Sequence, residues 1–314
     1  MVRLLAPHAE RSKVLNPAIE GAIEMLSIFD DIKDRMANID TPDLSKLSGI
    51  PFVSDMLSRL MGPTDPPAEP PAPHQDPIVG TDADESLTGT DSGDVIDARG
   101  GSDTVYGKAG DDIIHTSGDG FDRLYGDEGN DELHGGNSGN LFHGGSDDDQ
   151  AYGGTGGDKI NGDSGNDFLH GGDGVDKVSG GFGNDTVIGG NGNDELVGGF
   201  GEDTFRFDRL DGSVDVVSDF NYVPDVDGAL DQGDHFELSL GAFTALSGSP
   251  GDLLSDDAFA LGAEAATSSQ HILYDQDEGA LLYDADGNGA SEAVQFASLA
   301  GSVELRASDF LLIS

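Results

Sequence analysis

The sequence predicts a mainly β protein. We expect a parallel β-roll with a β-rich C-terminal cap and a small α-helical N-terminal segment. Two observations lead to this prediction. From residue 80 onward, glycine-rich turns alternate with short apolar stretches every nine residues, and residues 80–206 hold 34 of the 48 glycines. The same stretch carries 28 acidic but only 6 basic side chains, so the carboxylates concentrate where glycine does.

The overall charge and composition exclude several classes of function. The 314-residue chain has 61 Asp+Glu against 15 Lys+Arg, a formal charge of −46. Nucleic-acid binding needs a basic surface, and anionic membranes would also repel such a chain. The absence of cysteine excludes disulfides, Cys-ligated zinc and thiol catalysis. No stretch has the roughly 18 apolar residues of a membrane span, and the start of the chain is not a Sec-type signal peptide. Taken alone, this start favours a cytoplasmic protein.

Residues 1–61 are expected to be helical. Asn16-Pro17 is a helix start signal, and apolar residues from Ile19 to Ile39 follow at near-helical spacing. Two interpretations stay open: a small helical bundle or partner-docking hairpin, and an amphipathic helix that acts on a membrane or partner. Residues 62–79 follow as a proline-rich, semi-rigid linker.

Residues 80–206 form fourteen nine-residue units, with a one-residue insertion near Thr116. The eighth position is apolar throughout, which a disordered acidic linker would not preserve. The sixth position is Asp in twelve units, the exceptions being Glu85 and Asn140. These twelve are Asp94, Asp103, Asp112, Asp122, Asp131, Asp149, Asp158, Asp167, Asp176, Asp185, Asp194 and Asp203.

The spacing of this repeat predicts calcium binding. Glycines in the first six positions permit tight turns with positive φ, and the last three positions form a short strand. Turn carbonyls and a carboxylate are the hard oxygen ligands that Ca²⁺ prefers. Two units make one coil, so we expect seven coils with turns on alternate sides. Because each unit buries only one apolar side chain, folding should depend on the metal.

The nonapeptide resembles the RTX (repeats-in-toxin) family over residues 80–206. The resemblance implies that the carbonyls at positions two and four and the sixth-position Asp ligate calcium, with roughly ten ions in all. The fourth-position glycines concerned are Gly110, Gly129, Gly156, Gly165, Gly174, Gly183, Gly192 and Gly201. Units 80–88, 135–143 and 144–152 depart from the pattern, which leaves their sites open.

Residues 207–314 leave the nine-residue period. Stretches around Phe207, Val216 and Phe236 are expected to be strands, residues 251–265 a short helix, and residues 280–299 a hairpin. The hairpin loop contains Asp284, Asp286 and Asn288, like the front half of an EF-hand loop. Its twelfth position is Gln295 instead of Glu, so an EF-hand is rejected. A calcium-binding loop and a plain polar turn both remain possible.

The C-terminal motifs resemble the serralysin-type C-terminal module of RTX proteins. They are Asp203-x-Phe205-x-Phe207, Asp215-x₃-Asp219-Phe220, Gly233-Asp234-x₃-Leu238-Ser239, the segment from Tyr283 to Gly289, and Asp309-Phe310. The resemblance implies a capping domain with an uncleaved type I secretion signal. The chain would then leave a Gram-negative cell through a type I ABC exporter, which replaces the cytoplasmic interpretation. A cap without an export role is the alternative.

No catalytic motif is identified in the sequence once the position of each candidate in the repeat is considered. None of the eight histidines lies in HExxH, and Ser164 in GDSG occupies an ordinary variable position of the repeat. We therefore expect a secreted, non-enzymatic calcium-binding protein whose N-terminal helices bind a surface, matrix or protein partner. The alternatives are a membrane-active or signalling effector and, third, an enzyme or enzyme fragment.

Overall fold

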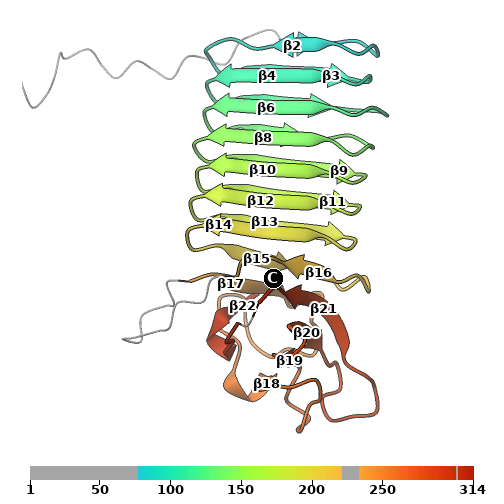
Figure 1. The fold of residues 1–314 in the computed structure, drawn as a ribbon, viewed down its shortest axis with the longest axis vertical. Helices are drawn as coiled ribbons and strands as arrows, with labels where there is room; N and C mark the ends of the chain where they lie inside the picture. The colour runs from blue at the N-terminus through green and yellow to red at the C-terminus, as the bar shows by residue number, and fades with distance from the viewer. Residues whose placement is uncertain (1–76, 221–232, 302) are drawn as a thin grey trace, which may run out of the picture. The chain divides into compact units, whose positions relative to one another are not determined.

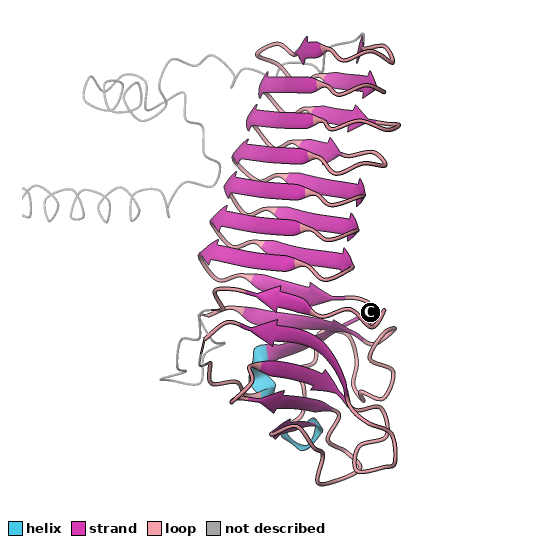
Figure 2. Cartoon of the chain, turned by 45° about the vertical axis from the view of Figure 1, so that its right-hand side comes forward, coloured by secondary structure: helices cyan, strands magenta, loops and turns pink. Residues whose placement is uncertain are grey.

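The computed structural model describes residues 77–220, 233–301 and 303–314. Strands dominate these residues, and the helical content among them consists of two 3₁₀ helices, η2 (Asp256–Ala258) and η3 (Ala307–Asp309) (Figure 2). The helices predicted for residues 1–61 and nearly all of the predicted linker lie outside the described residues.

Two sheets contain the described strands (Figure 1). Of the residues described, the ten-stranded sheet contains, in spatial order, β1 (Ile78–Val79), β3 (Val95–Arg99), β5 (Ile113–Thr116), β7 (Glu132–His134), β9 (Gln150–Thr155), β11 (Phe168–Asp173), β13 (Thr186–Asn191), β15 (Thr204–Phe207), β17 (His235–Ser239) and β22 (Phe310–Ile313).

The twelve-stranded sheet, counted over the same residues, contains β2 (Ser86–Thr88), β4 (Thr104–Ala109), β6 (Arg123–Glu128), β8 (Leu141–Ser146), β10 (Lys159–Ser164), β12 (Lys177–Phe182), β14 (Glu195–Phe200), β16 (Asp215–Val217), β21 (Val294–Leu299), β20 (Ala280–Tyr283), β19 (Ile272–Asp275) and β18 (Phe259–Leu261).

The chain alternates between the two sheets from β1 to β16, so each pair of strands forms one coil of a parallel β-roll. The described residues make eight coils, one more than predicted. Ile78–Val79 already pairs with β3 before the first recognised repeat, and Asp215–Val217 pairs with β14 after the last one. The roll therefore extends beyond the recognised repeats at both ends. Ile78 pairs with Ile96 at the 18-residue spacing of the repeat, whereas Val216 pairs with Glu195 across a longer connection, which strand pairing tolerates.

The core of the roll is the column of eighth-position side chains. Successive coils are in register at 18 residues, for example Ile160 opposite Val178, and at 19 residues where Val105 faces Leu124 across the predicted insertion. The eighth-position side chains from Ile96 to Phe205 are fully buried, including the small Ala151. Parallel pairing with an exact side-chain period explains why the sequence keeps an apolar residue at this position.

The cap continues both sheets. β17 and β22 extend the ten-stranded sheet, and the antiparallel β19–β20–β21 meander extends the twelve-stranded sheet, as predicted for the hairpin at 280–299. The prediction of a helix at 251–265 is wrong, since the chain forms only the single turn η2 and then β18. β18 pairs with β19, and Phe259 packs against Phe310 at 5.7 Å between ring centroids. That packing favours an extended backbone over a helix.

Candidate calcium sites

The turns of the roll adopt a backbone that depends on glycine. The eight fourth-position glycines named above have positive φ, from 100° at Gly110 to 152° at Gly174. A Cβ built on Gly174 would lie 1.4 Å from the carbonyl oxygen of Gly156, one coil earlier. The hydrogen bonds of the turns leave these fourth-position carbonyls without an amide donor among the described residues. Their lone pairs are therefore available to a cation.

The sixth-position aspartates stack in two ladders along the roll. In each ladder, the backbone amide of one aspartate donates to the Oδ1 of its counterpart one coil later, as from Asp149 to Asp167 at 2.8 Å and from Asp158 to Asp176 at 2.7 Å. All twelve predicted aspartates are 3% exposed or less. Each carboxylate except that of Asp94 thus has one oxygen bound to the backbone of the preceding coil. Asp94 Oδ2 instead accepts from the amide and hydroxyl of Thr90 in its own turn.

The second carboxylate oxygen is buried and has no hydrogen-bond partner in most of these residues. This holds for Oδ2 of Asp103, Asp112, Asp131, Asp149, Asp158, Asp167, Asp176, Asp185 and Asp194, and for Oδ1 of Asp94. The Oδ2 atoms lie over the first-position glycine of their own unit. A Cβ on Gly162 would lie 2.1 Å from Asp167 Oδ2 and 2.7 Å from the Gly180 carbonyl oxygen, so only glycine leaves this space open.

Burial makes these carboxylates hard to ionise without a cation. Burial, and then repulsion from Asp131 and Asp167, raises the pKa of Asp149 to about 8 despite the hydrogen bond from the Asp131 amide. Burial likewise raises the pKa of Asp131 and of Asp185 to about 7. A buried anionic oxygen beside a carbonyl oxygen, with no donor, is the donor set that a hard divalent cation fits.

The two ladders occupy opposite edges of the roll. The first edge holds the turns that lead from the ten-stranded to the twelve-stranded sheet. Its ladder is Glu85, Asp103, Asp122, Asn140, Asp158, Asp176, Asp194 and Asp215. The second edge holds the return turns. Its ladder is Asp94, Asp112, Asp131, Asp149, Asp167, Asp185, Asp203 and Asp234.

Asp215 and Asp234 are ladder members that sequence analysis did not place at the metal sites. Asp215 begins β16 in the last coil of the roll, and Asp234 precedes β17 in the cap. They accept from the amides of Asp194 and Asp203 at 3.0 Å. Burial, with repulsion from Asp194, raises the pKa of Asp215 to about 7. The available signal was the repeat's own pattern of an Asp two residues before a buried apolar residue, Val217 or Phe236, without the nine-residue spacing.

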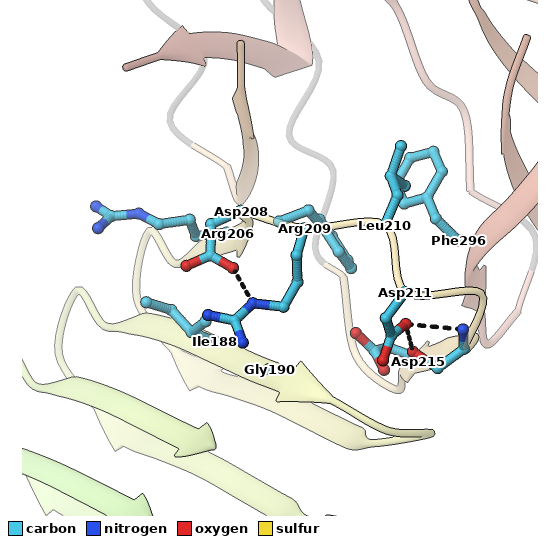
Figure 3. Close-up of a pocket in the computed structure, with 11 residues that line it drawn as sticks. Ile188, Gly190, Arg206, Asp208, Arg209, Leu210, Asp211, Asp215 and Phe296 are labelled. Carbon is cyan, nitrogen blue, oxygen red and sulfur yellow. Dashed lines mark hydrogen bonds and ion pairs between the residues drawn. The ribbon is translucent and has the colours of Figure 1, made fainter. Parts of the chain in front are cut away.

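Figure 3 shows the segment between β15 and β16 where the first ladder enters the cap. Asp208 accepts from Arg209 Nε at 2.9 Å, and Asp211 accepts from the amide and hydroxyl of Ser213. Asp211 also accepts from the Gly192 amide at 3.1 Å. These bonds hold the longer connection against the coil before it, so that Asp215 reaches the same position as a repeat aspartate.

A family model for the RTX calcium-binding nonapeptide repeat, described as four copies, matches residues 79–114, 116–151, 143–178, 152–187 and 170–205. Residues 79–205 of the chain are RTX calcium-binding nonapeptide repeats. No curated protein sequence matches it. Among solved structures, it is similar to the extracellular lipase LipA from Serratia marcescens, with 17% identity over 76% of this chain and a TM-score of 0.23. The match spans 40% of the lipase chain.

The RTX units that depart from the pattern differ among themselves. Asp149, in unit 144–152, is an ordinary ladder member with a partnerless Oδ2. Glu85 bends back and accepts from the amide and hydroxyl of Thr81, which uses its carboxylate within its own turn. Asn140 occupies the ladder position, but it has an NH₂ group where the aspartates have Oδ2.

The second edge of the RTX roll has a further ladder at the fifth position of the repeat. Backbone amides donate to the side-chain oxygen one coil earlier, at 2.7–3.0 Å, from Asn130 to Asp111, Asp148 to Asn130, Asn166 to Asp148, Asn184 to Asn166 and Glu202 to Asn184. On the first edge this ladder is interrupted. Asp84, Ser102 and Asn193 accept from the amides of the next coil at 2.8–3.1 Å, whereas Gly139, Gly157 and the 69% exposed Val175 have no acceptor side chain. Sequence analysis missed this difference because it did not separate alternate units.

The hairpin loop of the RTX cap uses its polar side chains within the turn. Asp286 accepts from the amides of Ala290 and Ser291, and Asn288 Nδ2 donates to the Ala266 carbonyl. Asp284 is buried, and its Oδ1 accepts from the Asp286 amide. The loop lines a pocket together with Ala263, Glu264 and Ala265. Calcium binding by this loop stays a prediction.

Side chains alone do not enclose a metal ion in the described part of the chain, which has no group of three or more His, Asp or Glu suited to one. Each ladder position supplies a single carboxylate, so backbone carbonyls would complete any site in the repeats. None of the described helices is long and apolar enough to cross a membrane.

Proposed function

We propose that this RTX protein is secreted through a type I exporter and folds on calcium outside the cell. The single observation that carries the proposal is the row of buried aspartate oxygens without partners. In the folded roll these oxygen atoms lose their hydration without gaining a hydrogen bond, and only protons or cations can offset that free-energy cost. When bound, calcium would supply the positive charge that the ladders lack.

The residues that would hold calcium are the ladder aspartates and the fourth-position glycines. Oδ2 of each aspartate and the carbonyls of the turns provide oxygen atoms, while Oδ1 and the backbone amides fix the carboxylate orientation. About ten ions would supply enough charge to balance the 22-charge acidic excess of residues 80–206.

Export is proposed to precede folding. The C-terminal strand β22, which falls within the proposed signal at residues 300–314, pairs with β17, and Phe310 and Leu312 are fully buried. A folded cap would hide this segment from an exporter. Low cytosolic calcium would keep the acidic chain unfolded, and external calcium would fold it after release. Deleting residues 300–314 should abolish secretion in cells that have the exporter, and continued secretion would contradict the export role.

The specific activity is proposed to reside in residues 1–61 as binding to a surface, matrix or protein partner, without catalysis. The support is the sequence pattern of that segment and the absence of a recognised catalytic motif. A pull-down with the calcium-loaded full chain, compared with a chain lacking residues 1–61, tests this assignment.

The calcium switch is tested by circular dichroism of the full chain during a Ca²⁺ titration. We expect a change from a largely unordered to a β-rich spectrum, with magnesium much less effective because it holds its water more tightly. Identical spectra with EDTA and with calcium would reject the switch.

A further inference from the structure

Asn140 places a hydrogen-bond donor where the other ladder members place an anionic oxygen. Its Oδ1 accepts from the Asp122 amide at 2.9 Å, which fixes Nδ2 on the opposite side of the amide group. Asn140 is 1% exposed, and Nδ2 has no acceptor. The partially positive NH₂ group therefore points into the space that the aspartates present to a cation.

The surroundings of this NH₂ group match those of an intact position. A Cβ on Gly135 would lie 3.0 Å from Asn140 Nδ2 and 2.1 Å from the Gly153 carbonyl oxygen. One coil later, a Cβ on Gly153 would lie 2.5 Å from Asp158 Oδ2 and 2.1 Å from the Gly171 carbonyl oxygen. The backbone cradle is thus present at Asn140, where an NH₂ group replaces the anionic oxygen. Phe142 Cζ, 2.7 Å from the Cβ built on Gly135, also borders this space.

The first edge has fewer side-chain hydrogen bonds between its coils at this point. The fifth-position residues there are Gly139 and Gly157, which have no side chain to accept from the next coil. On the second edge, Asn130 and Asp148 accept from the amides of the next coil at the same level of the roll. On the first edge, Ser138 Oγ accepts from the Gly120 amide at 3.1 Å, and the fifth-position bonds are confined to the second edge at this level.

Asn140 also separates an irregular from a regular part of the roll. Before it, β1, β2, β3, β5 and β7 have two to five residues and β4 and β6 have six, whereas every strand from β8 to β14 has six. The earlier part also contains the 19-residue coils.

We propose that Asn140 divides the roll into two calcium-loading units that fold at different calcium concentrations. The stability of a solenoid is close to a sum over its repeats and their neighbouring interfaces, so a weak interface allows one side to fold without the other. Residues 141–217 fold with the cap at lower calcium, and residues 77–140 fold at higher calcium. This inference rests on calcium binding by the ladders.

Hydrogen exchange with mass spectrometry on the full chain, at a series of Ca²⁺ concentrations, tests the division. Peptides from residues 77–140 should become protected at a midpoint about threefold or more above that of peptides from 141–217. Asn140→Asp should reduce this gap and add one bound calcium, counted by equilibrium dialysis with metal analysis. Asn137→Asp is the matched control, because it adds the same charge at an exposed position of the same unit.

The outcomes separate this inference from the proposed function. Protection that does not respond to calcium anywhere in the roll would reject calcium-driven folding itself. A single shared midpoint in the natural chain, or an unchanged gap and an unchanged calcium count in Asn140→Asp, would reject only the division. If Asn140→Asp does not fold, Asp158→Asn provides the converse test, and it should lower the calcium count by one and weaken protection of the preceding coils.

Discussion

The two edges of the roll share one repeat but hold their coils together differently. The second edge combines an uninterrupted aspartate ladder with the fifth-position ladder through Asn130, Asp148, Asn166 and Asn184. The first edge has an aspartate ladder broken at Asn140 and lacks fifth-position caps at Gly139, Gly157 and Val175. The comparison teaches that the second edge has a continuous row of hydrogen bonds that need no metal. On the first edge the fifth-position bonds are interrupted between Ser102 and Asn193, so the coils there depend more on calcium.

The largest expected effect comes from the turn backbone, which both edges share. Gly174→Ala on the first edge and Gly183→Ala on the second would place Cβ 1.4 and 1.8 Å from a carbonyl oxygen of the previous coil, at positive φ. Each should lower the free energy of unfolding by roughly 3 kcal/mol or more, measured by urea unfolding in calcium. Gly241→Ala is the control, since its Cβ would meet only Ser239 Oγ at 3.4 Å. A mild effect at Gly174 alone would show that the first-edge turns are looser than the structure indicates.

The next largest effect is the pH dependence of the calcium-free protein. Unfolded aspartates titrate near pH 4, whereas burial raises the pKa of Asp149 to about 8 and of Asp131 to about 7 in the roll. A raised folded pKa contributes stability that is complete below pH 4 and is lost as the pH rises through about 6 to 8.

The metal-free roll should therefore resist urea better at pH 5 than at pH 8. With calcium the order should reverse, because the ligands must be deprotonated. Titration of the carboxylates, followed by NMR, should find more of the raised pKa values on the second edge, because its ladder has no asparagine. Greater stability of the metal-free protein at pH 8 would contradict the ladder model.

Single ladder positions should distinguish the edges more finely. Asp176→Asn and Asp167→Asn each replace a partnerless Oδ2 by an NH₂ group, and each should lose about one calcium and about 1 to 3 kcal/mol. The loss should be larger for Asp176, because its neighbour Val175 offers no acceptor to the next coil, whereas Asn166, next to Asp167, accepts from the Asn184 amide. Thermal unfolding at a series of calcium concentrations measures the loss of stability in each variant. Equal losses would mean that the fifth-position hydrogen bonds do not stabilise the neighbouring ladder position.

The smallest effects are expected at the fifth position itself. Asn184→Ala removes the acceptor for the Glu202 amide and should cost about 0.5 to 1.5 kcal/mol without changing the calcium count. Val175→Asn would offer an acceptor to the next first-edge coil and should stabilise the roll by a few tenths of a kcal/mol up to about 1 kcal/mol. Thermal unfolding in saturating calcium checks both. A lower calcium count in Asn184→Ala would show that this position also ligates the metal.

Much of the roll was predictable because its repeat couples side-chain chemistry to a strict period. The buried column from Ile96 to Phe205, the positive φ of the fourth-position glycines and the burial of the twelve aspartates all follow from that period. The strand β16 and the ladder position of Asp234 were missed because Asp215 joins its ladder after a 21-residue interval and Asp234 after 31 residues. Intervals of that length carry no periodic signal, although the local Asp-x-apolar pattern is present.

The sequence by itself determined that alternate turns would stack and that carboxylates would line them, because a nine-residue period returns each residue type to the same place. It also showed that the chain has one chemical exception at Asn140 and one at Glu85. Only the tertiary structure decided which oxygen of each aspartate is satisfied, since Oδ1 meets an amide about eighteen residues away while Oδ2 meets none. It likewise decided that the two edges differ, because hydrogen bonds between coils join residues that the sequence separates into alternate units.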